Sequence, residues 1–119
     1  MEIRNFLTFD DRAALRRWLE VNHGRERECW VACYRGKAAM AGALPYVEVV
    51  WEALCFGWID STVKKLPDGR LAQRISSRRK NSHWTELNIQ RCQELERQGL
   101  MTDAGRNALP HNINTFDQK

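Results

Sequence analysis

Two alternating segments and the turn between them decide the fold: Trp58–Leu66 (WIDSTVKKL) and Arg70–Ser77 (RLAQRISS), joined by Pro67-Asp68-Gly69. Alternation of apolar and polar residues is the period of a half-buried strand. A three-residue loop with glycine in the left-handed position is a common hairpin connection. The sequence therefore predicts an antiparallel β-hairpin at the centre of the fold.

Pairing Leu66 with Arg70 sets the register of this hairpin, because it sorts the side chains into an apolar face and a polar face. In this register Val63 lies opposite Gln73, and Thr62 lies opposite Arg74. The apolar face consists of Ile59, Val63, Leu71 and Ile75. The polar face consists of Trp58, Asp60, Thr62 and Lys64 on the first strand and of Ala72, Arg74, Ser76 and Arg78 on the second.

Helices and one further strand are predicted around the hairpin. A helix opens at Asp10-Asp11 and ends at Gly24, and the apolar run 29–34 is typical of a buried strand. A second helix runs from Tyr46 to Phe56, with Glu48 and Glu52 facing water. A third runs from Trp84 to Gln98 with Ser82 as its cap, and a short fourth helix starts at Thr102.

This pattern predicts an α+β fold, a small antiparallel β-sheet with a central hairpin packed against several α-helices. We expect a single domain over residues 1–110, followed by a polar C-terminal tail over 111–119.

The composition is that of a globular domain, with 119 residues, 43% hydrophobic and 29% charged. No apolar run approaches the ~20 residues that span a bilayer, and the N-terminus lacks the apolar centre of a secretory signal. We therefore expect no membrane insertion. The four cysteines, Cys29, Cys33, Cys55 and Cys92, lie in predicted strands and helices, and we interpret them as reduced and buried. Reduced thiols suit the cytoplasm, which is the localisation we predict.

Positive charge is concentrated on the hairpin. Between Lys64 and Lys80 there are seven basic residues and a single acid, Asp68, so this segment carries +6 although the whole chain carries only +4. On the polar face, Asp60 lies across from Ser76 with Arg74 and Arg78 as diagonal neighbours. One carboxylate between two guanidiniums leaves unpaired donors that match carboxylate and phosphate oxygens. The alternative interpretation is a solvated ladder of salt bridges.

The sequence contains no recognised catalytic or metal-binding pattern. The histidines are scattered, the cysteines lack coordinating spacing, and neither a glycine-rich phosphate loop nor a pair of catalytic carboxylates is found. We therefore expect no catalytic residues, no metal and no cofactor. An enzyme of unfamiliar type, with Asp60 as acid or base, is the alternative that this reasoning leaves open.

Our first functional hypothesis is a binding domain whose partner is a small anionic ligand or an acidic protein or peptide. Its candidate residues are Trp58, Asp60, Arg74, Arg78, Trp84 and Asn88. The aspartate would hold the arginines, the arginines would contact the anion, and the tryptophans would wall the site. The second hypothesis is a nucleic-acid-binding protein that tracks phosphates with Lys64, Lys65, Arg70, Arg79 and Lys80.

A family resemblance is carried by the run 52–60 (EALCFGWID) together with Gln73-Arg74, Arg78, Ser82, Trp84, Asn88, Arg91, Gly99, Met101-Thr102 and Gly105. In these residues the chain resembles the YdeI/OmpD-associated family, also described as bacteriocin-protection proteins. The similarity extends over about residues 18–105, and the chain resembles a short form without the C-terminal helical segment of many relatives. The resemblance implies an α+β fold, a role in protection against bacteriocins or cationic antimicrobial peptides, and no established enzymatic activity.

Overall fold

The computed structural model describes residues 2–79 and 82–110. Its sheet has the strand order β1-β2-β5-β4, with a fifth strand, β3, also paired to β2. The strands are β1 (Phe6–Leu7), β2 (Glu28–Tyr34), β3 (Leu44–Pro45), β4 (Trp58–Lys65) and β5 (Leu71–Ser77). β4, β5 and β2 are antiparallel, as predicted, whereas the two short strands β1 and β3 run parallel to β2. The α+β fold predicted from the sequence is confirmed. The predicted tail, residues 111–119, lies outside the described residues.

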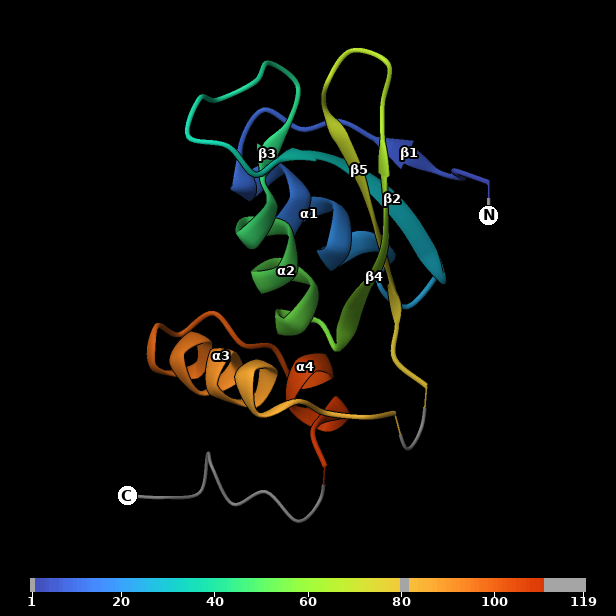
Figure 1. Cartoon of the computed structure of the whole chain (residues 1–119). Coiled ribbons are helices and arrows are strands. Elements are labelled where there is room, and N and C mark those ends of the chain that lie inside the picture. The colour runs from blue at the N-terminus through green and yellow to red at the C-terminus, as the bar shows by residue number, and fades with distance from the viewer. Residues whose placement is uncertain (1, 80–81, 111–119) are drawn as a thin grey trace.

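Four helices complete the described fold: α1 (Arg12–Asn22), α2 (Tyr46–Cys55), α3 (Glu86–Arg97) and α4 (Asp103–Ala108). α1 and α2 lie against one face of the sheet, and α3 and α4 pack against α2 (Figure 1). None of these helices is long and apolar enough to cross a membrane.

Side-chain caps begin three of the helices, because they accept hydrogen bonds from backbone N–H groups that the first turn leaves unpaired. Asp11 caps α1 and Thr102 caps α4, close to the predicted starts. α3 is capped by Thr85, and the prediction of Ser82 as its cap was wrong. Threonine and serine are interchangeable in this role, so local sequence does not distinguish the two candidates.

The core lies between the helices and one face of the sheet, which we call the helix face. Cys29, Val31 and Ile75 point into this core, and the residues paired with them share their face. The other face, which we call the outer face, carries Trp30 and its cross-strand partner Arg74. All four cysteines are free and buried, as predicted. Burial raises the pKa of the Cys29 thiol to about 12, so it stays protonated and unreactive near neutral pH.

The hairpin forms, but its register changes half-way along. Near the turn Val63 pairs with Gln73, as predicted, whereas Asp60 pairs with Ile75 and a β-bulge lies between Asp60 and Val63. The Gln73 side chain is 1% exposed, and its amide donates to the carbonyls of Ser61 and Thr62, both at 3.3 Å. A buried amide thus satisfies the backbone oxygens that the bulge removes from the ladder.

Because of the bulge, the side chains of β4 that precede Ser61 lie on the opposite face of the sheet from the one predicted. The predicted positions of Ile59, Trp58 and Asp60 were therefore wrong: Ile59 lies on the outer face, and the other two lie on the helix face. A shift of one residue moves every following side chain to the opposite face.

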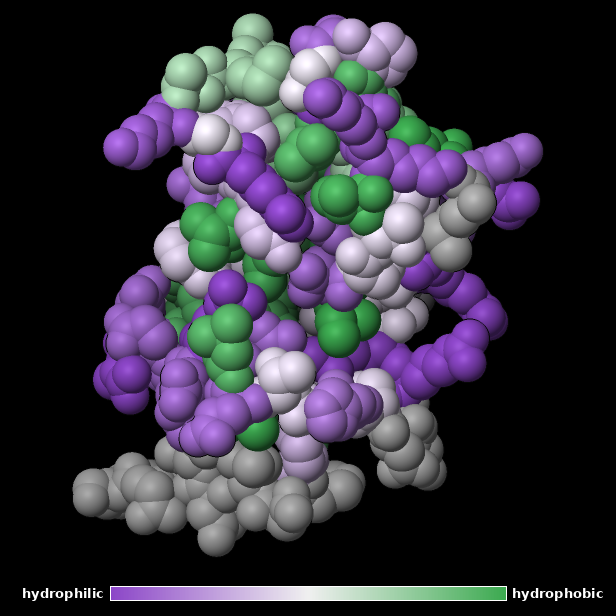
Figure 2. Space-filling model, viewed as in Figure 1, coloured by the Kyte–Doolittle hydropathy of each residue, from purple (hydrophilic) through white to green (hydrophobic). Residues whose placement is uncertain are grey.

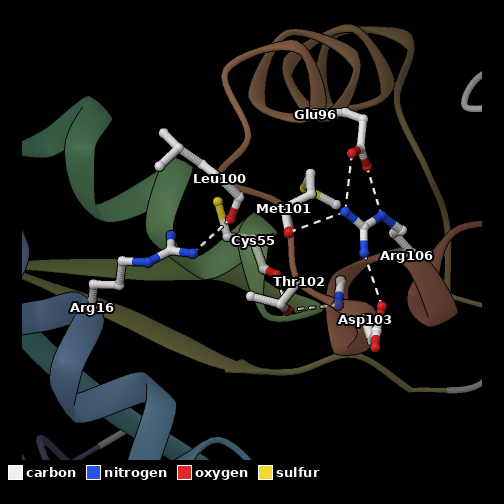
Figure 3. Close-up of polar contacts among 9 residues, drawn as sticks. Arg16, Cys55, Glu96, Leu100, Met101, Thr102, Asp103 and Arg106 are labelled. Atoms are coloured by element: carbon white, nitrogen blue, oxygen red, sulfur yellow. Dashed lines mark hydrogen bonds and ion pairs between the residues drawn. The ribbon is translucent and has the colours of Figure 1, made fainter.

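The run EALCFGW, residues 52–58, joins three helices to the sheet. Glu52 is 1% exposed, so the prediction that it faces water was wrong. Its carboxylate is bound by Arg12 and, at 3.1 Å, by Arg16. Arg16 also donates to the Leu100 carbonyl at 2.7 Å, as Figure 3 shows. The two arginines compensate a charge that burial would otherwise make costly.

The C-terminal end of α2 packs directly on α4. The Cys55 carbonyl accepts hydrogen bonds from the Thr102 hydroxyl and from its backbone N–H (Figure 3). A Cβ on Gly105 would lie 2.4 Å from the Cys55 carbonyl oxygen, so only glycine fits there. A Cβ on Gly57, whose φ is +77°, would lie 2.8 Å from the Ala104 carbonyl oxygen. The glycines and the threonine therefore fix how α4 sits against α2 and β4.

Candidate functional site: an arginine pocket at the end of the sheet

A hollow of about 510 Å³ lies where β2 and β4 begin and β5 ends. We call it the arginine pocket, and its lining residues are Arg27, Ile59, Arg74, Ser76, Ser77, Arg78, Arg79 and Ser82. Strongly hydrophilic side chains surround this end of β5 and the segment that follows it (Figure 2). Four guanidiniums and three hydroxyls give the hollow many hydrogen-bond donors and a positive charge.

Strand pairing brings these residues together from distant parts of the sequence. The Ser77 N–H donates to the Arg27 carbonyl at 3.0 Å, which sets the start of β2 beside the end of β5. The Arg78 N–H donates to the Gly57 carbonyl at 3.3 Å and so extends the contact of β5 with the start of β4. The bulge turns Ile59 to the outer face, where it forms part of the pocket wall.

Arg78 is held on three sides. Its guanidinium stacks on the Trp84 ring, 3.5 Å from the ring centroid, and its Nη1 donates to the Ser82 hydroxyl at 3.0 Å and to the His83 carbonyl at 3.1 Å. Its Nε and Nη2 are buried, and within residues 2–79 and 82–110 neither has a hydrogen-bond partner. Burial lowers the pKa of Arg78 from its usual value, since the surroundings solvate the charge less well than water does. An arginine nevertheless remains charged near neutral pH.

Arg74 has its own carboxylate. Its Nε contacts Glu28 Oε1 at 2.5 Å, and its Nη1 donates to the hydroxyls of Ser61 and Ser76 at 3.2 and 3.4 Å. The sequence predicted that Asp60 would take this place. Glu28 does so because β2 is the neighbour of β5 on the outer face, where Arg74 points.

Arg27 and Arg79 contribute exposed charge to the pocket. Among the part of the chain that the structure describes, neither side chain forms an ion pair or hydrogen bond. Glu28 is therefore the only carboxylate seen to pair with a pocket arginine in that part. The pocket has an uncompensated positive charge.

Two of the predicted site residues lie elsewhere. Trp58 is 1% exposed, packs edge-on against Trp18 and donates from its indole to the His23 carbonyl at 3.3 Å. Asp60 accepts a hydrogen bond from the Tyr46 hydroxyl at 3.1 Å on the helix face. Burial first, and then this carboxylate, raises the pKa of Tyr46. The predicted role of Trp58 as a site wall was wrong, because the bulge directs it into the core.

The other predicted residues remain near the pocket or on the adjacent helix. Arg78 and Trp84 are in contact, as the hypothesis requires. The Asn88 side chain accepts from Arg91 at 3.1 Å within α3, and its backbone N–H meets the Thr85 cap. Asn88 therefore stabilises the first turns of α3, the helix that follows Trp84.

The residues of the nucleic-acid hypothesis do not form one surface. Lys64 pairs with Ala72 on the outer face, whereas Lys65 pairs with Leu71 on the helix face. Arg70 is bound at the turn by Asp68, at 2.8 Å, and by the Gly42 carbonyl. Arg79 belongs to the arginine pocket at the other end of β5. Lys80 lies outside the described residues.

A family model matches residues 7–108, and its description is a domain of unknown function, DUF8412. The chain belongs to the DUF8412 family. The matched stretch contains α1 to α4 and every residue that lines the arginine pocket. No curated protein and no solved structure matches the chain.

Sequence reasoning missed Arg27 and Ser82 as lining residues of the arginine pocket, and Glu28 as the carboxylate that pairs with Arg74. Arg27 and Glu28 lie some 50 residues before the arginines that they join, and only the pairing of β2 with β5 makes them neighbours. A local signal existed for Ser82, a hydroxyl beside the basic run, but the residue was assigned to a helix cap. The structure describes no group of three or more histidine, cysteine or acidic side chains that could hold a metal in residues 2–79 and 82–110.

Proposed function

We propose that this DUF8412 domain is a non-enzymatic binding domain that recognises an oxyanion, a phosphate or a carboxylate, in the arginine pocket. One observation carries the proposal: four arginines line one hollow, and within residues 2–79 and 82–110 only Arg74 among them forms an ion pair with a carboxylate. Like charges held close together repel one another, which costs free energy. A bound oxyanion would remove that cost.

The guanidinium of an arginine has the right shape for this ligand. Nε–H and Nη2–H point the same way and form a parallel pair, which matches two oxygens of one carboxylate or phosphate. The stacking on Trp84 and the two bonds from Nη1 leave Arg78 few alternative conformations. A receptor fixed in advance binds more tightly, because less side-chain entropy is lost on association.

The pocket geometry favours this proposal over nucleic-acid binding. Single-stranded nucleic acid is held largely by bases stacking on exposed aromatic rings. Trp84 already has Arg78 against one face, and Lys64 and Lys65 point to opposite faces of the sheet. A continuous phosphate track needs its cations on one surface.

The remaining sequence-based expectations belong to the same proposal. Cytoplasmic localisation is supported by four buried free thiols, which suit a reducing compartment. A role in bacteriocin protection and membership of the YdeI/OmpD-associated family remain predictions, and the binding proposal does not depend on either.

Titration calorimetry with inorganic phosphate and acetate tests the proposal. We expect saturable binding of at least one of these anions, and a loss of about tenfold or more in Arg78→Lys, because an ammonium cannot supply the paired donors. Arg97→Lys is the matched control, since Arg97 lies on α3 and pairs with Glu94, outside the pocket. Equal anion affinity in Arg78→Lys and the native protein would refute the site.

A further inference from the structure

We infer that the ligand of the arginine pocket is a phosphate monoester in its dianionic form, and that a carboxylate or a phosphodiester fits less well. The inference rests on the proposed function and narrows it to one class of compound. Three properties of the pocket support it: its charge, its free hydroxyl donors and its volume.

The charge of the pocket exceeds what one negative charge compensates. Arg27 and Arg79 have no ionic partner among the described residues, and Arg78 forms no ion pair there either. Only Arg74 has a carboxylate, from Glu28. A carboxylate or a phosphodiester brings one negative charge, whereas a phosphate monoester brings nearly two near neutral pH. The dianion therefore compensates more of the uncompensated charge.

The hydroxyls of the pocket are positioned as donors. Ser82 Oγ accepts from Arg78 Nη1, and Ser76 Oγ accepts from Arg74 Nη1. A hydroxyl that accepts from a guanidinium keeps its own O–H free to donate. With the exposed guanidiniums of Arg27 and Arg79, the pocket then offers donors from at least four side chains. The three terminal oxygens of a monoester have more acceptor sites for them than the two oxygens of a carboxylate or diester.

The volume allows an organic group beside the phosphate. At about 510 Å³ the hollow is within the ~300–1,000 Å³ range of small-molecule sites. Ile59 supplies an apolar wall on the outer face, next to the hydroxyl of its cross-strand partner Ser76. The phosphate would lie at the arginines and hydroxyls, and the ester group would lie toward Ile59.

Four probes separate the possibilities: phenyl phosphate, phenyl sulfate and benzoate, which share a phenyl group, and the phosphodiester dimethyl phosphate, all compared by calorimetry at pH 8. Phenyl sulfate keeps the three terminal oxygens but has one negative charge. We expect phenyl phosphate to bind about tenfold or more tightly than phenyl sulfate, since its second negative charge strengthens the attraction to the arginines. Benzoate and dimethyl phosphate should bind more weakly still.

Two serine variants provide a matched test of the hydroxyl argument. Ser61 and Ser76 both accept from Arg74 Nη1, but only Ser76 lines the pocket. Ser76→Ala should reduce the preference for phenyl phosphate over benzoate several-fold, whereas Ser61→Ala should leave it unchanged.

The outcomes distinguish this inference from the proposed function. Benzoate binding as tightly as phenyl phosphate, with both lost in Arg78→Lys, would overturn the monoester and retain the oxyanion site. Tightest binding of dimethyl phosphate would overturn the monoester in favour of a phosphodiester. Binding of none of the four probes, with the protein folded by circular dichroism, would overturn the proposed function itself.

Discussion

Two arginine clusters of this domain differ in whether a carboxylate compensates their buried charge. At the centre of the fold, Arg12 and Arg16 enclose the buried carboxylate of Glu52. In the arginine pocket, Arg78 is also partly buried, but no carboxylate pairs with it among the described residues. Arg12 leaves its Nη2 without a partner too, yet its charge is compensated by Glu52.

The difference separates a structural role from a binding role. A compensated buried charge holds elements together, and removing either partner is costly. An uncompensated one lowers stability and is retained where a site needs it. The run EALCFGW belongs to the first kind: its residues join α2 to α1, α4 and β4.

Removing Glu52 should have the largest effect. Glu52→Ala leaves two arginines beside an empty buried site, and we expect the free energy of unfolding to fall by about 3 kcal/mol in urea denaturation. Glu48→Ala, on the same helix but without an ion pair among the described residues, should change the free energy of unfolding by less than about 0.5 kcal/mol. Similar losses of unfolding free energy in the two variants would refute the distinction between a structural and a binding arginine cluster.

Crowding the contact between α2 and α4 should have the next largest effect. In Gly105→Ala the new Cβ would meet the Cys55 carbonyl, so the backbone must move, and overpacking of this kind costs ~1–3 kcal/mol. Gly36→Ala is the control, since nothing lies within 4 Å of a Cβ there. Thermal denaturation of both variants measures the difference, and full stability of Gly105→Ala would show that α4 can shift freely.

Replacing Arg78 should separate stability from binding. We expect Arg78→Met to be as stable as the native protein without anion, or more stable by up to about 1 kcal/mol, because an uncompensated charge is removed. The native protein should gain about 1.4 kcal/mol at a phosphate concentration of ten times Kd, and the variant should gain nothing. If Arg78→Met lost several kcal/mol of stability without anion, the role of Arg78 would be structural.

The smallest effect is expected at an exposed ion pair. Hydrogen bonds from Arg106, at 2.7 and 3.0 Å, hold the pKa of Glu96 below its usual value (Figure 3). A depressed pKa contributes stability at pH above the ordinary glutamate pKa of about 4.3, and that stability is lost as the pH falls through the folded-state pKa. Glu96→Gln should therefore reduce the fall in stability below about pH 4.5.

The change should amount to less than about 1 kcal/mol, since both partners are partly exposed. The same substitution in an Arg106→Ala background should have no further effect. If the stability of Glu96→Gln fell at acid pH as much as that of the native protein, this fall would be due to other carboxylates.

Local sequence was sufficient for the turn, two helix starts and the fold class. Gly69 occupies the left-handed region at φ of +95°, as the predicted hairpin loop requires, and Asp11 and Thr102 cap the helices they precede. These features depend on neighbours a few residues apart, so their physical causes are contained in short stretches of chain.

The tertiary structure alone decided which residues form the site. The bulge at Ser61 and Thr62 depends on the side chain of Gln73 from the next strand, and no pattern within β4 signals it. That single bulge turns Trp58 and Asp60 to the helix face and brings Ile59 to the pocket. Arg27 and Glu28 reach the pocket only through the pairing of β2 with β5. Alternation in sequence predicts faces correctly only while the ladder is regular, because one extra residue inverts every face beyond it.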